Sequence, residues 1–219
     1  MATRQVLAEL TAGFAQATGH HAAIESVGGV DAARRVQAGE AFDVVVLASD
    51  AIDKLMAAGC LRPGSKVDWV RSGVAVAVPA GAPLPDISSE DAVRDAVLAA
   101  PSISVSTGPS GVALARLFER WGIAHEIAPR MVQAPPGVPV GSLVAKGQVA
   151  LGFQQLSELL HVQGIAIVGP LPPAIQITTT FSAGIGVHSQ QADAARELLA
   201  YMASPAAADA KRKQGMEPA

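Results

Sequence analysis

The sequence predicts an α/β fold built from two lobes, and three observations predict it. Short apolar, β-branched runs alternate with amphipathic runs along the whole chain, which is the pattern of strands alternating with helices. Half of the 219 residues are hydrophobic but only 4% are aromatic, so small aliphatic side chains must fill much of the core. The strand and helix series also occurs twice, which favours two lobes over one.

The two series define the domain boundaries. We expect lobe I at residues 1–78 plus 184–219 and lobe II at residues 79–183, each with a parallel-rich sheet flanked by helices. The chain crosses between them near 78–83 and again near 178–184, so two crossover segments form a hinge beside a ligand cleft. One continuous doubly wound sheet is the alternative.

The first series begins with an amphipathic helix. Leu7, Leu10 and Phe14 share one helical face, and Gly19 is a stop signal. β-Branched runs and capping residues predict the elements that follow. They are a strand at 22–27, a helix capped by Asp31 and ending at Gly39, a buried strand of parallel type at 43–47, a helix capped by Asp50 and ending at Gly59, and a strand at 73–79.

The second series opens with a capping-box spacing, Ser88 and Asp91, with Asp in place of the usual Glu or Gln. Apolar periodicity and glycine stops predict the rest. The elements are a helix to about 99, strands at 102–105, 131–134, 149–153 and 165–168, helices at 112–121, 140–146 and 156–161, a β-rich run at 175–187, and two final helices, the second from Pro205.

Composition excludes several classes of function. The formal net charge of −3, without a basic stripe, argues against nucleic-acid binding. Cys60 is the single cysteine and the five histidines are scattered, so we expect no disulfide, no metal site and no cofactor. The sequence has no apolar run of about eighteen residues, so we expect no membrane insertion. The first residues lack the apolar region of a signal peptide, so the sequence as it stands predicts a cytoplasmic protein, or a periplasmic one if a leader was removed or omitted.

Residues 106–111, Ser-Thr-Gly-Pro-Ser-Gly, are the most informative segment. They end a predicted strand and open a predicted helix, where unpaired N–H groups and about half a positive charge favour an anion. A well-capped helix start is the simpler interpretation. Ligands of α/β sheets bind at the carboxyl ends of strands, which selects this segment and four other loops. Those loops are 28–29, 48–49, 136–138 and 154–155.

These loops are rich in hydroxyls, amides, glycine and backbone N–H groups and poor in carboxylates, which suits an anionic ligand. Arg4 adds a positive charge if the first helix starts at the cleft. The candidate ligand-binding residues are Thr3, Arg4, Gly28, Gly29, Ser49, Ser106, Thr107, Gly108, Ser110, Gly111, Pro136, Gly137, Val138, Gln154 and Gln155.

No catalytic residue is identified. A nucleophile elbow, a P-loop and a dinucleotide-binding motif are all absent from the sequence. Glu25 and Glu158 are the carboxylates nearest the candidate loops, and we expect Glu158 on an exposed helix face.

The sequence resembles the molybdate-binding-protein-like branch of ABC-transporter solute-binding proteins, which have the type II periplasmic binding fold. Residues 6–19, 39–45, 106–111, 147–153, 204–208 and 215–218 carry the resemblance, which covers nearly the whole chain. Family members have a strand and a serine-containing loop before the first helix, and Thr3 stands where that loop ends. Molybdate binders carry a tyrosine where this chain has Gln154 and Gln155, so the resemblance implies an organic anion such as a carboxylate.

The resemblance implies two functions. The first is a solute-binding protein that closes on a small anion, with an ABC-transporter permease as partner. The second is an isomerase, because the family includes a subset similar to trans-aconitate isomerase, which moves an allylic proton in a small polycarboxylate. A transcription-regulator effector domain shares this fold, but the chain has no helix-turn-helix segment.

Overall fold

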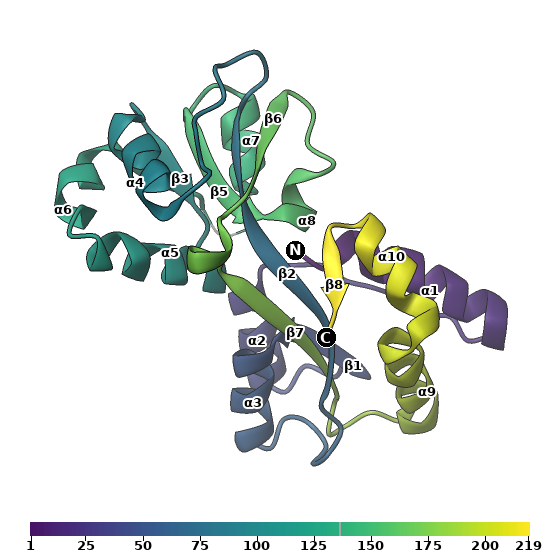
Figure 1. Ribbon diagram of the computed structural model, residues 1–219. Helices are drawn as coiled ribbons and strands as arrows, with labels where there is room; N and C mark the ends of the chain where they lie inside the picture. The colour runs from purple at the N-terminus through teal and green to yellow at the C-terminus, as the bar shows by residue number, and fades with distance from the viewer. Residues whose placement is uncertain (136) are drawn as a thin grey trace. The chain divides into compact units, whose positions relative to one another are not determined.

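The computed structural model describes residues 1–135 and 137–219, and these divide into two compact units (Figure 1). Unit 1 contains Met1–Ser72 and Thr179–Ala219, and unit 2 contains Gly73–Thr178. The chain therefore passes between the units at residues 72–73 and 178–179, a few residues before each boundary expected from the sequence. The mixed α/β architecture, with sheets flanked by helices, is confirmed.

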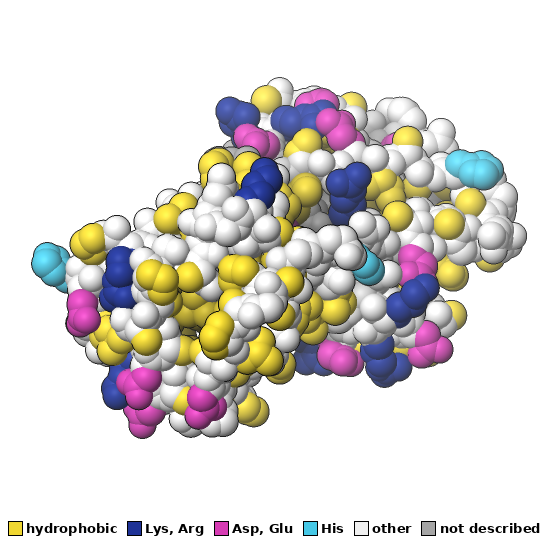
Figure 2. All heavy atoms as spheres, turned by 90° about the horizontal axis from the view of Figure 1, so that it is seen from above, with side chains coloured by type: hydrophobic (Ala, Val, Ile, Leu, Met, Phe, Trp, Pro, Cys, Tyr) yellow, Lys and Arg dark blue, Asp and Glu magenta, His cyan; other side chains and the backbone are white. Residues whose placement is uncertain are grey.

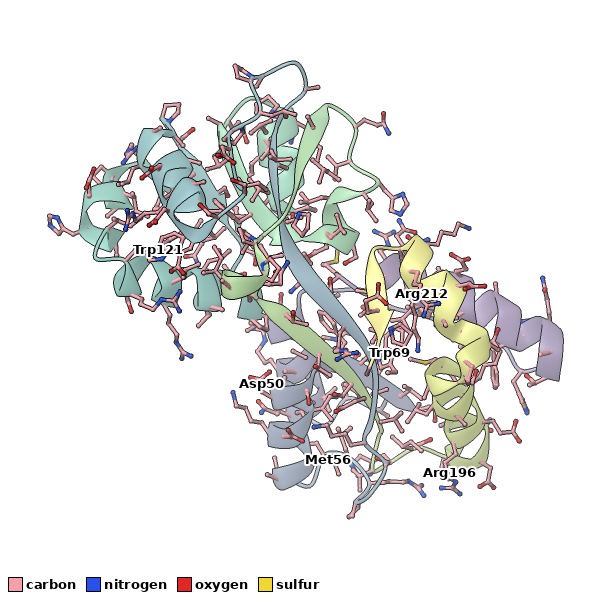
Figure 3. The ribbon with its side chains drawn as sticks, in the orientation of Figure 1. Asp50, Met56, Trp69, Trp121, Arg196 and Arg212 are labelled. Carbon is pink, nitrogen blue, oxygen red and sulfur yellow. The ribbon has the colours of Figure 1, made fainter. Side chains whose placement is uncertain are left out.

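Unit 1 combines the first helices and strands of the chain with its last ones. Its elements are α1 (Arg4–Thr18), α2 (Gly29–Gln37), β1 (Val44–Ala48), α3 (Ser49–Ala57), the first half of β2 (Val67–Pro79), β7 (Thr178–Ile185), α9 (Ala192–Ala203), η3 (Pro205–Ala207), α10 (Ala208–Lys213) and β8 (Met216–Pro218). Asp50 and Met56 mark the two ends of α3 in Figure 3.

Strand β1 explains the layers of unit 1, because its two faces alternate between two apolar clusters. Val44 and Val46 pack on the cluster formed with α1 and α9, whereas Val45 and Leu47 face α2 and α3. Helices thus cover both faces of β1, as its continuous apolar sequence predicts.

Three details of unit 1 differ from the sequence prediction. Strand β1 pairs antiparallel with β7, with Val44 opposite Ile185, so the expected parallel pairing of 43–47 is wrong. Residues 22–27 form no strand, because residues 22–25 are exposed and the described chain gives them no strand partner. Asp31 and Asp50 lie within the first turns of α2 and α3 and do not cap them, since Gly28 and Ala48 hold the cap positions.

Unit 2 contains the second series. Its elements are the second half of β2, α4 (Glu90–Ala99), β3 (Ile103–Val105), α5 (Pro109–Arg120), α6 (Ala124–Ile127), η1 (Ala128–Arg130), β4 (Met131–Gln133), α7 (Val140–Ala145), β5 (Leu151–Gln155), α8 (Leu156–Leu159), β6 (Ile165–Pro170) and η2 (Pro173–Ile175).

The strands of unit 2 are arranged in the order β2, β5, β3, β4, and β6 also pairs with β2. Strand β3 pairs parallel with both β4 and β5, which confirms the predicted parallel arrangement in this part of the chain. Strand β2 instead pairs antiparallel with β5 and β6. The parallel strands therefore form one edge region in which three carboxyl ends point the same way.

Helices lie on both faces of these parallel strands. Helices α4 and α5 pack on one face through Val97, Leu114 and Phe118, while α7 packs on the other through Val140 and Val144. A Cβ on Gly152 of β5 would lie 2.5 Å from a methyl carbon of Val144. Glycine at this position therefore lets α7 approach β5 closely.

The start of α4 differs by one residue from the predicted capping box. Ser89 is the cap, and its hydroxyl oxygen accepts a hydrogen bond from the Ala92 N–H at 3.1 Å. Ser88 lies outside the helix, where its N–H donates to Asp86. The predicted capping box of Ser88 and Asp91 is therefore wrong: the neighbouring serine caps the helix, and Asp91 pairs with Arg94.

The charged side chains form no basic stripe on the face drawn in Figure 2, where blue and magenta groups are scattered and mixed. This agrees with the formal net charge of −3. Among the described residues, no helix is long and apolar enough to span a membrane.

Candidate anion site

The carboxyl ends of three parallel strands meet in unit 2. Val105, the last residue of β3, pairs with Gln133 of β4 on one side and with Phe153 of β5 on the other. Strands β3 and β4 are followed by predicted site residues, and β5 ends with two of them. The Ala134 N–H donates to the Val105 carbonyl at 3.0 Å, which ties β4 to β3 beyond the ladder. This edge is where α/β sheets bind ligands.

Residues 106–111, called the anion seat below, join β3 to α5. Gly108 is the cap residue of α5, and no side chain caps this helix. The Ser106 hydroxyl oxygen accepts a hydrogen bond from the Gly108 N–H at 3.3 Å and lies 3.4 Å from the Ser110 hydroxyl oxygen. The intrahelical ladder begins with the Val112 N–H donating to the Gly108 carbonyl at 3.1 Å. The N–H groups of Ser110 and Gly111 therefore belong to the first turn, which an α-helix leaves for an external acceptor.

Gly111 is required by the shape of the anion seat. A Cβ at this position would lie 1.8 Å from the Ser106 carbonyl oxygen, closer than any real contact. The chain leaving β3 thus folds directly over the first turn of α5. Ser106 and Ser110 come together for this reason, and a larger residue at 111 would separate them.

Gln154 and Gln155 lie within β5, not in a loop after it, and their exposed fractions are only 2% and 3%. The Gln154 side-chain oxygen Oε1 accepts a hydrogen bond from the Gly141 N–H at 3.0 Å, at the start of α7. Gln154 is therefore a fixed polar group beside the end of β3. The expectation that these glutamines follow the strand is wrong by two residues, because the strand ladder with β2 extends to Val74 opposite Gln155.

Glu158 is a residue that sequence reasoning placed incorrectly. It lies in α8, directly after β5, and it is half-buried instead of being on an exposed helix face. Burial raises the pKa of its carboxyl group, and a hydrogen bond from the Gln154 side chain acts in the opposite direction. The sequence carries no local signal for this contact, because Gln154 lies in a strand and Glu158 in the short helix that follows it.

The loop between β4 and α7 contributes backbone to the same edge. Gly137 adopts a left-handed conformation with φ of 77°, and the Val138 N–H donates to the Pro135 carbonyl at 3.0 Å. Val138 is exposed. Pro136, the third predicted contact in this loop, lies outside the described residues.

The predicted residues of unit 1 all lie at helix starts. Gly28 and Gly29 begin α2 and Ser49 begins α3, and both helices pack on β1. A Cβ on Gly29 would contact Leu47 near the carboxyl end of β1, so these two helix starts lie at one edge. Thr3 is the cap residue of α1 and Arg4 its first residue, which is exposed. The helix that these two residues begin, α1, packs on α9 and α10.

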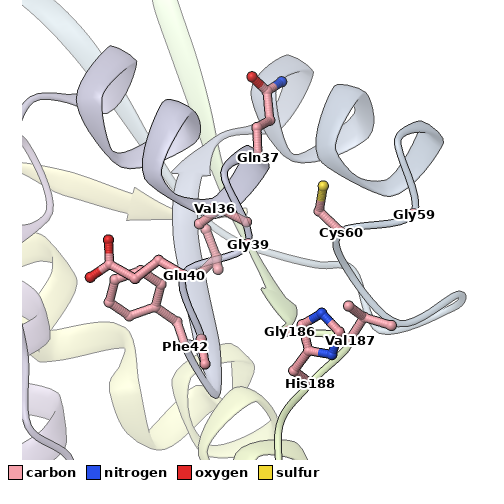
Figure 4. Close-up of a pocket in the computed structure, with 12 residues that line it drawn as sticks. Val36, Gln37, Gly39, Glu40, Phe42, Gly59, Cys60, Gly186, Val187 and His188 are labelled. Atoms are coloured by element: carbon pink, nitrogen blue, oxygen red, sulfur yellow. The ribbon is translucent and has the colours of Figure 1, made fainter.

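A hollow of about 180 Å³ in unit 1 lies at the opposite end of β1 (Figure 4). Gly39 and Gly59, which follow the carboxyl ends of α2 and α3, border it together with Phe42, Cys60 and His188. Helix carboxyl ends carry partial negative charge, so this hollow does not suit an anion. Among the described residues, no group of three or more His, Cys, Asp or Glu side chains is placed to hold a metal ion.

Comparison with known proteins gives one family. The family model for bacterial extracellular solute-binding proteins matches residues 1–217. An aconitate isomerase from Pseudomonas sp is 43% identical over 185 residues, which cover 84% of this chain and 70% of that protein.

Solved structures of similar fold are more distant in sequence. The periplasmic molybdate-binding protein of Azotobacter vinelandii has a TM-score of 0.80 at 22% identity, covering 98% of this chain and 95% of that one. The sulfate-binding protein of Mycobacterium tuberculosis has a TM-score of 0.77 at 14% identity, covering 98% and 83%. The tungstate-binding protein of Desulfovibrio alaskensis has a TM-score of 0.70 at 16% identity, covering 97% and 92%. These structures share the fold of this chain.

Proposed function

Because the chain belongs to the family of bacterial extracellular solute-binding proteins, we propose that it binds a small organic polycarboxylate at the anion seat of unit 2. The observation that carries the proposal is the uncapped start of α5, where the Ser106 and Ser110 hydroxyls stand beside first-turn N–H groups. Hydroxyls and N–H groups together donate several hydrogen bonds to one carboxylate without a competing negative charge.

Gln154 favours a carboxylate over a tetrahedral oxyanion. Its side chain is buried with its oxygen on the Gly141 N–H, so a neutral amide and not a charged group lies at this end of β5. A planar carboxylate has two acceptor oxygens that suit paired donors, whereas molybdate and sulfate present four oxygens in a tetrahedron. Gly28, Gly29 and Ser49 of unit 1 remain predicted contacts for the rest of the ligand.

A second function is favoured by a separate observation, the 43% identity to a protein named aconitate isomerase. Isomerisation of aconitate moves one proton along an allylic system, and it needs donors for the carboxylates and a base near the carbon. The anion seat supplies the donors. We therefore propose aconitate isomerisation as the reaction that this scaffold performs on its bound ligand.

Family membership supports two further proposals. A binding role in the periplasm, after removal of a leader, implies that the liganded protein delivers its polycarboxylate to an ABC-transporter permease. A catalytic role needs no permease. The two roles therefore differ in one observable: a binding protein releases its ligand unchanged, and an isomerase does not.

A thermal-shift panel tests the binding proposal. The purified chain is melted with cis-aconitate, trans-aconitate, citrate, molybdate and sulfate. We expect a tricarboxylate to raise the melting temperature, since a ligand that binds only the folded state stabilises it. A shift with molybdate or sulfate and none with any tricarboxylate would refute the organic-anion assignment.

Proton NMR with trans-aconitate tests the catalytic proposal. Appearance of the cis isomer, absent with heat-inactivated protein, is the expected result. Tight binding of the ligand without any conversion would restrict the protein to a binding role.

A further inference from the structure

We propose that unit 2 holds a second ligand site, separate from the anion seat, which binds a monocarboxylate with an apolar chain. The inference does not depend on the function proposed above, because it concerns a different part of unit 2. It is carried by a hollow beside α5, by the arginines that border this hollow, and by its apolar floor.

The hollow lies between one face of α5 and the chain at the end of η2. Helix α5 contributes Ala113, Arg116, Leu117 and Arg120, and residues 174–177 form the opposite wall. The four helix positions are spaced i, i+3, i+4 and i+7, so they share one face of α5. The volume of about 310 Å³ falls within the range of about 300–1,000 Å³ that is typical of small-molecule sites. All of these residues belong to unit 2.

The wall opposite α5 is held in place by the side chain of Gln176. Its Oε1 accepts a hydrogen bond from the Val74 N–H at 3.0 Å. Its Nε2 donates to the carbonyls of Val74 and Leu171 at 3.2 Å and 3.3 Å. The amide group of Gln176 is thus engaged by the backbone of unit 2. The hollow is therefore formed without a ligand, and Gln176 shapes it.

Positive charge borders the hollow. Arg116 is exposed, and within the described part of the chain it has no ion pair or side-chain hydrogen bond. Arg120 donates from Nη2 to Glu90 at 2.9 Å, which leaves most of its five N–H groups for another acceptor. None of the described residues that line the hollow is acidic. A carboxylate can therefore accept two parallel hydrogen bonds from Arg116, a common pairing of guanidinium with carboxylate groups.

The floor of the hollow is apolar. Leu117 and Ile175 are only 6% and 5% exposed and belong to the largest apolar cluster of unit 2, against which Ile177 also packs. Ala113 and Ala174 contribute only methyl groups, and these small side chains leave space for a ligand. An apolar chain bound here would leave water, and each buried methylene raises affinity by about fourfold.

The hollow and the anion seat differ in chemistry, although both involve α5. The anion seat offers hydroxyls and first-turn N–H groups, whereas the hollow offers a guanidinium group beside aliphatic side chains. A tricarboxylate has three charges and little apolar surface, so it does not match the floor of the hollow. A monocarboxylate with an apolar chain matches both parts, because its charge meets Arg116 and its chain covers Leu117 and Ile175.

Amide NMR of the isotope-labelled chain during titration with hexanoate tests the proposal. We expect the largest shift changes at residues 113–120 and 174–177. Hexanoate should bind more tightly than butanoate, by up to about 15-fold, since it buries two more methylenes. Hexanamide, which has the chain without the charge, and acetate, which has the charge without the chain, should each bind at least about fivefold more weakly than hexanoate.

Two variants remove the two halves of the site. R116Q removes the charge and A174L places a larger side chain in the hollow, and we expect each to weaken hexanoate binding by about fivefold or more. The matched control is R196Q in α9, which makes the same change of net charge in unit 1 and should leave hexanoate binding unchanged. The double variant S106A/S110A should also bind hexanoate normally, because it changes only the anion seat.

Four results would overturn the proposal. One is equal hexanoate affinity in R116Q and R196Q, and another is equal affinity of the unmodified chain for hexanoate and hexanamide. A third is that the shift changes occur at residues 106–111 and disappear in S106A/S110A, which would assign hexanoate to the anion seat. The fourth is the absence of any shift change at millimolar hexanoate. None of these results bears on whether the anion seat binds a polycarboxylate, so the two proposals fail independently.

Discussion

Two helix starts in unit 2 contrast in how they satisfy their first turn. Helix α4 is closed by its own cap, because Ser89 accepts a hydrogen bond from the Ala92 N–H at 3.1 Å. Helix α5 has no side-chain cap, and Ser106 instead accepts from the Gly108 N–H in the loop before the helix. The first start contributes to stability, and the second leaves donors for a ligand. A serine at the cap position, Ser89, thus closes its helix, whereas a serine two residues before the cap, Ser106, leaves its helix open.

The largest expected effect is that of G111A in α5. The added Cβ would overlap the Ser106 carbonyl oxygen, so the backbone must move and the anion seat must open. We expect a loss of about 1–3 kcal/mol in the free energy of unfolding, together with loss of ligand binding, measured by denaturant titration and calorimetry. The matched control is G108A, whose Cβ would lie 3.6 Å from the Ser106 hydroxyl oxygen and should be tolerated.

The closed start should respond in stability alone. S89A removes the cap of α4, and we expect a loss of about 1 kcal/mol in the free energy of unfolding without a change in ligand affinity. Chemical denaturation and calorimetry measure the two quantities. A drop in affinity for trans-aconitate in this variant would show that the two helix starts are not independent.

The open start should respond in affinity alone. S106A removes one hydroxyl donor from the anion seat, and we expect an affinity loss of about 5- to 10-fold at nearly unchanged stability. The T107A variant, which changes the next residue of the same loop, is compared with S106A. An S106A variant that loses stability but keeps its affinity would make Ser106 a loop-forming residue.

The smallest expected effect is the acid sensitivity of α4. Hydrogen bonds from Trp121, which follows α5 (Figure 3), and from Arg120 hold the pKa of Glu90 below its ordinary value of 4.5. A lowered pKa means that Glu90 contributes its full stability above pH 4.5 and loses it as the pH falls through the lowered value. Melting temperatures of E90Q and the unmodified chain should therefore converge in acid, and a constant difference at every pH would contradict this.

Local signals predicted the strand-to-helix junction at residues 106–111. A β-branched run followed by Ser, Thr, Gly and Pro is typical of a strand that ends at a helix start, and the structure has β3 and α5 there. Helix ends at Gly19 and Gly122 were also predictable, since both glycines adopt the left-handed conformation that stops a helix.

Long-range pairing was not predictable from local patterns. Strand β1 has the apolar sequence typical of a parallel strand, but it pairs antiparallel with β7, which lies far along the chain. Strand β8 spans Met216–Pro218 and gains its structure only by pairing with β2. Glu158 is half-buried because tertiary packing around α8 decides its exposure, which the periodicity of a four-residue helix does not reveal.

The most direct test of the open helix start is a calorimetric titration of trans-aconitate into three proteins. These are the unmodified chain, the double variant S106A/S110A and the α4 variant S89A. We predict binding to the unmodified chain, an affinity loss of about tenfold or more in the double variant, and unchanged affinity in S89A. Equal affinity in all three proteins would contradict the assignment of the ligand to the start of α5.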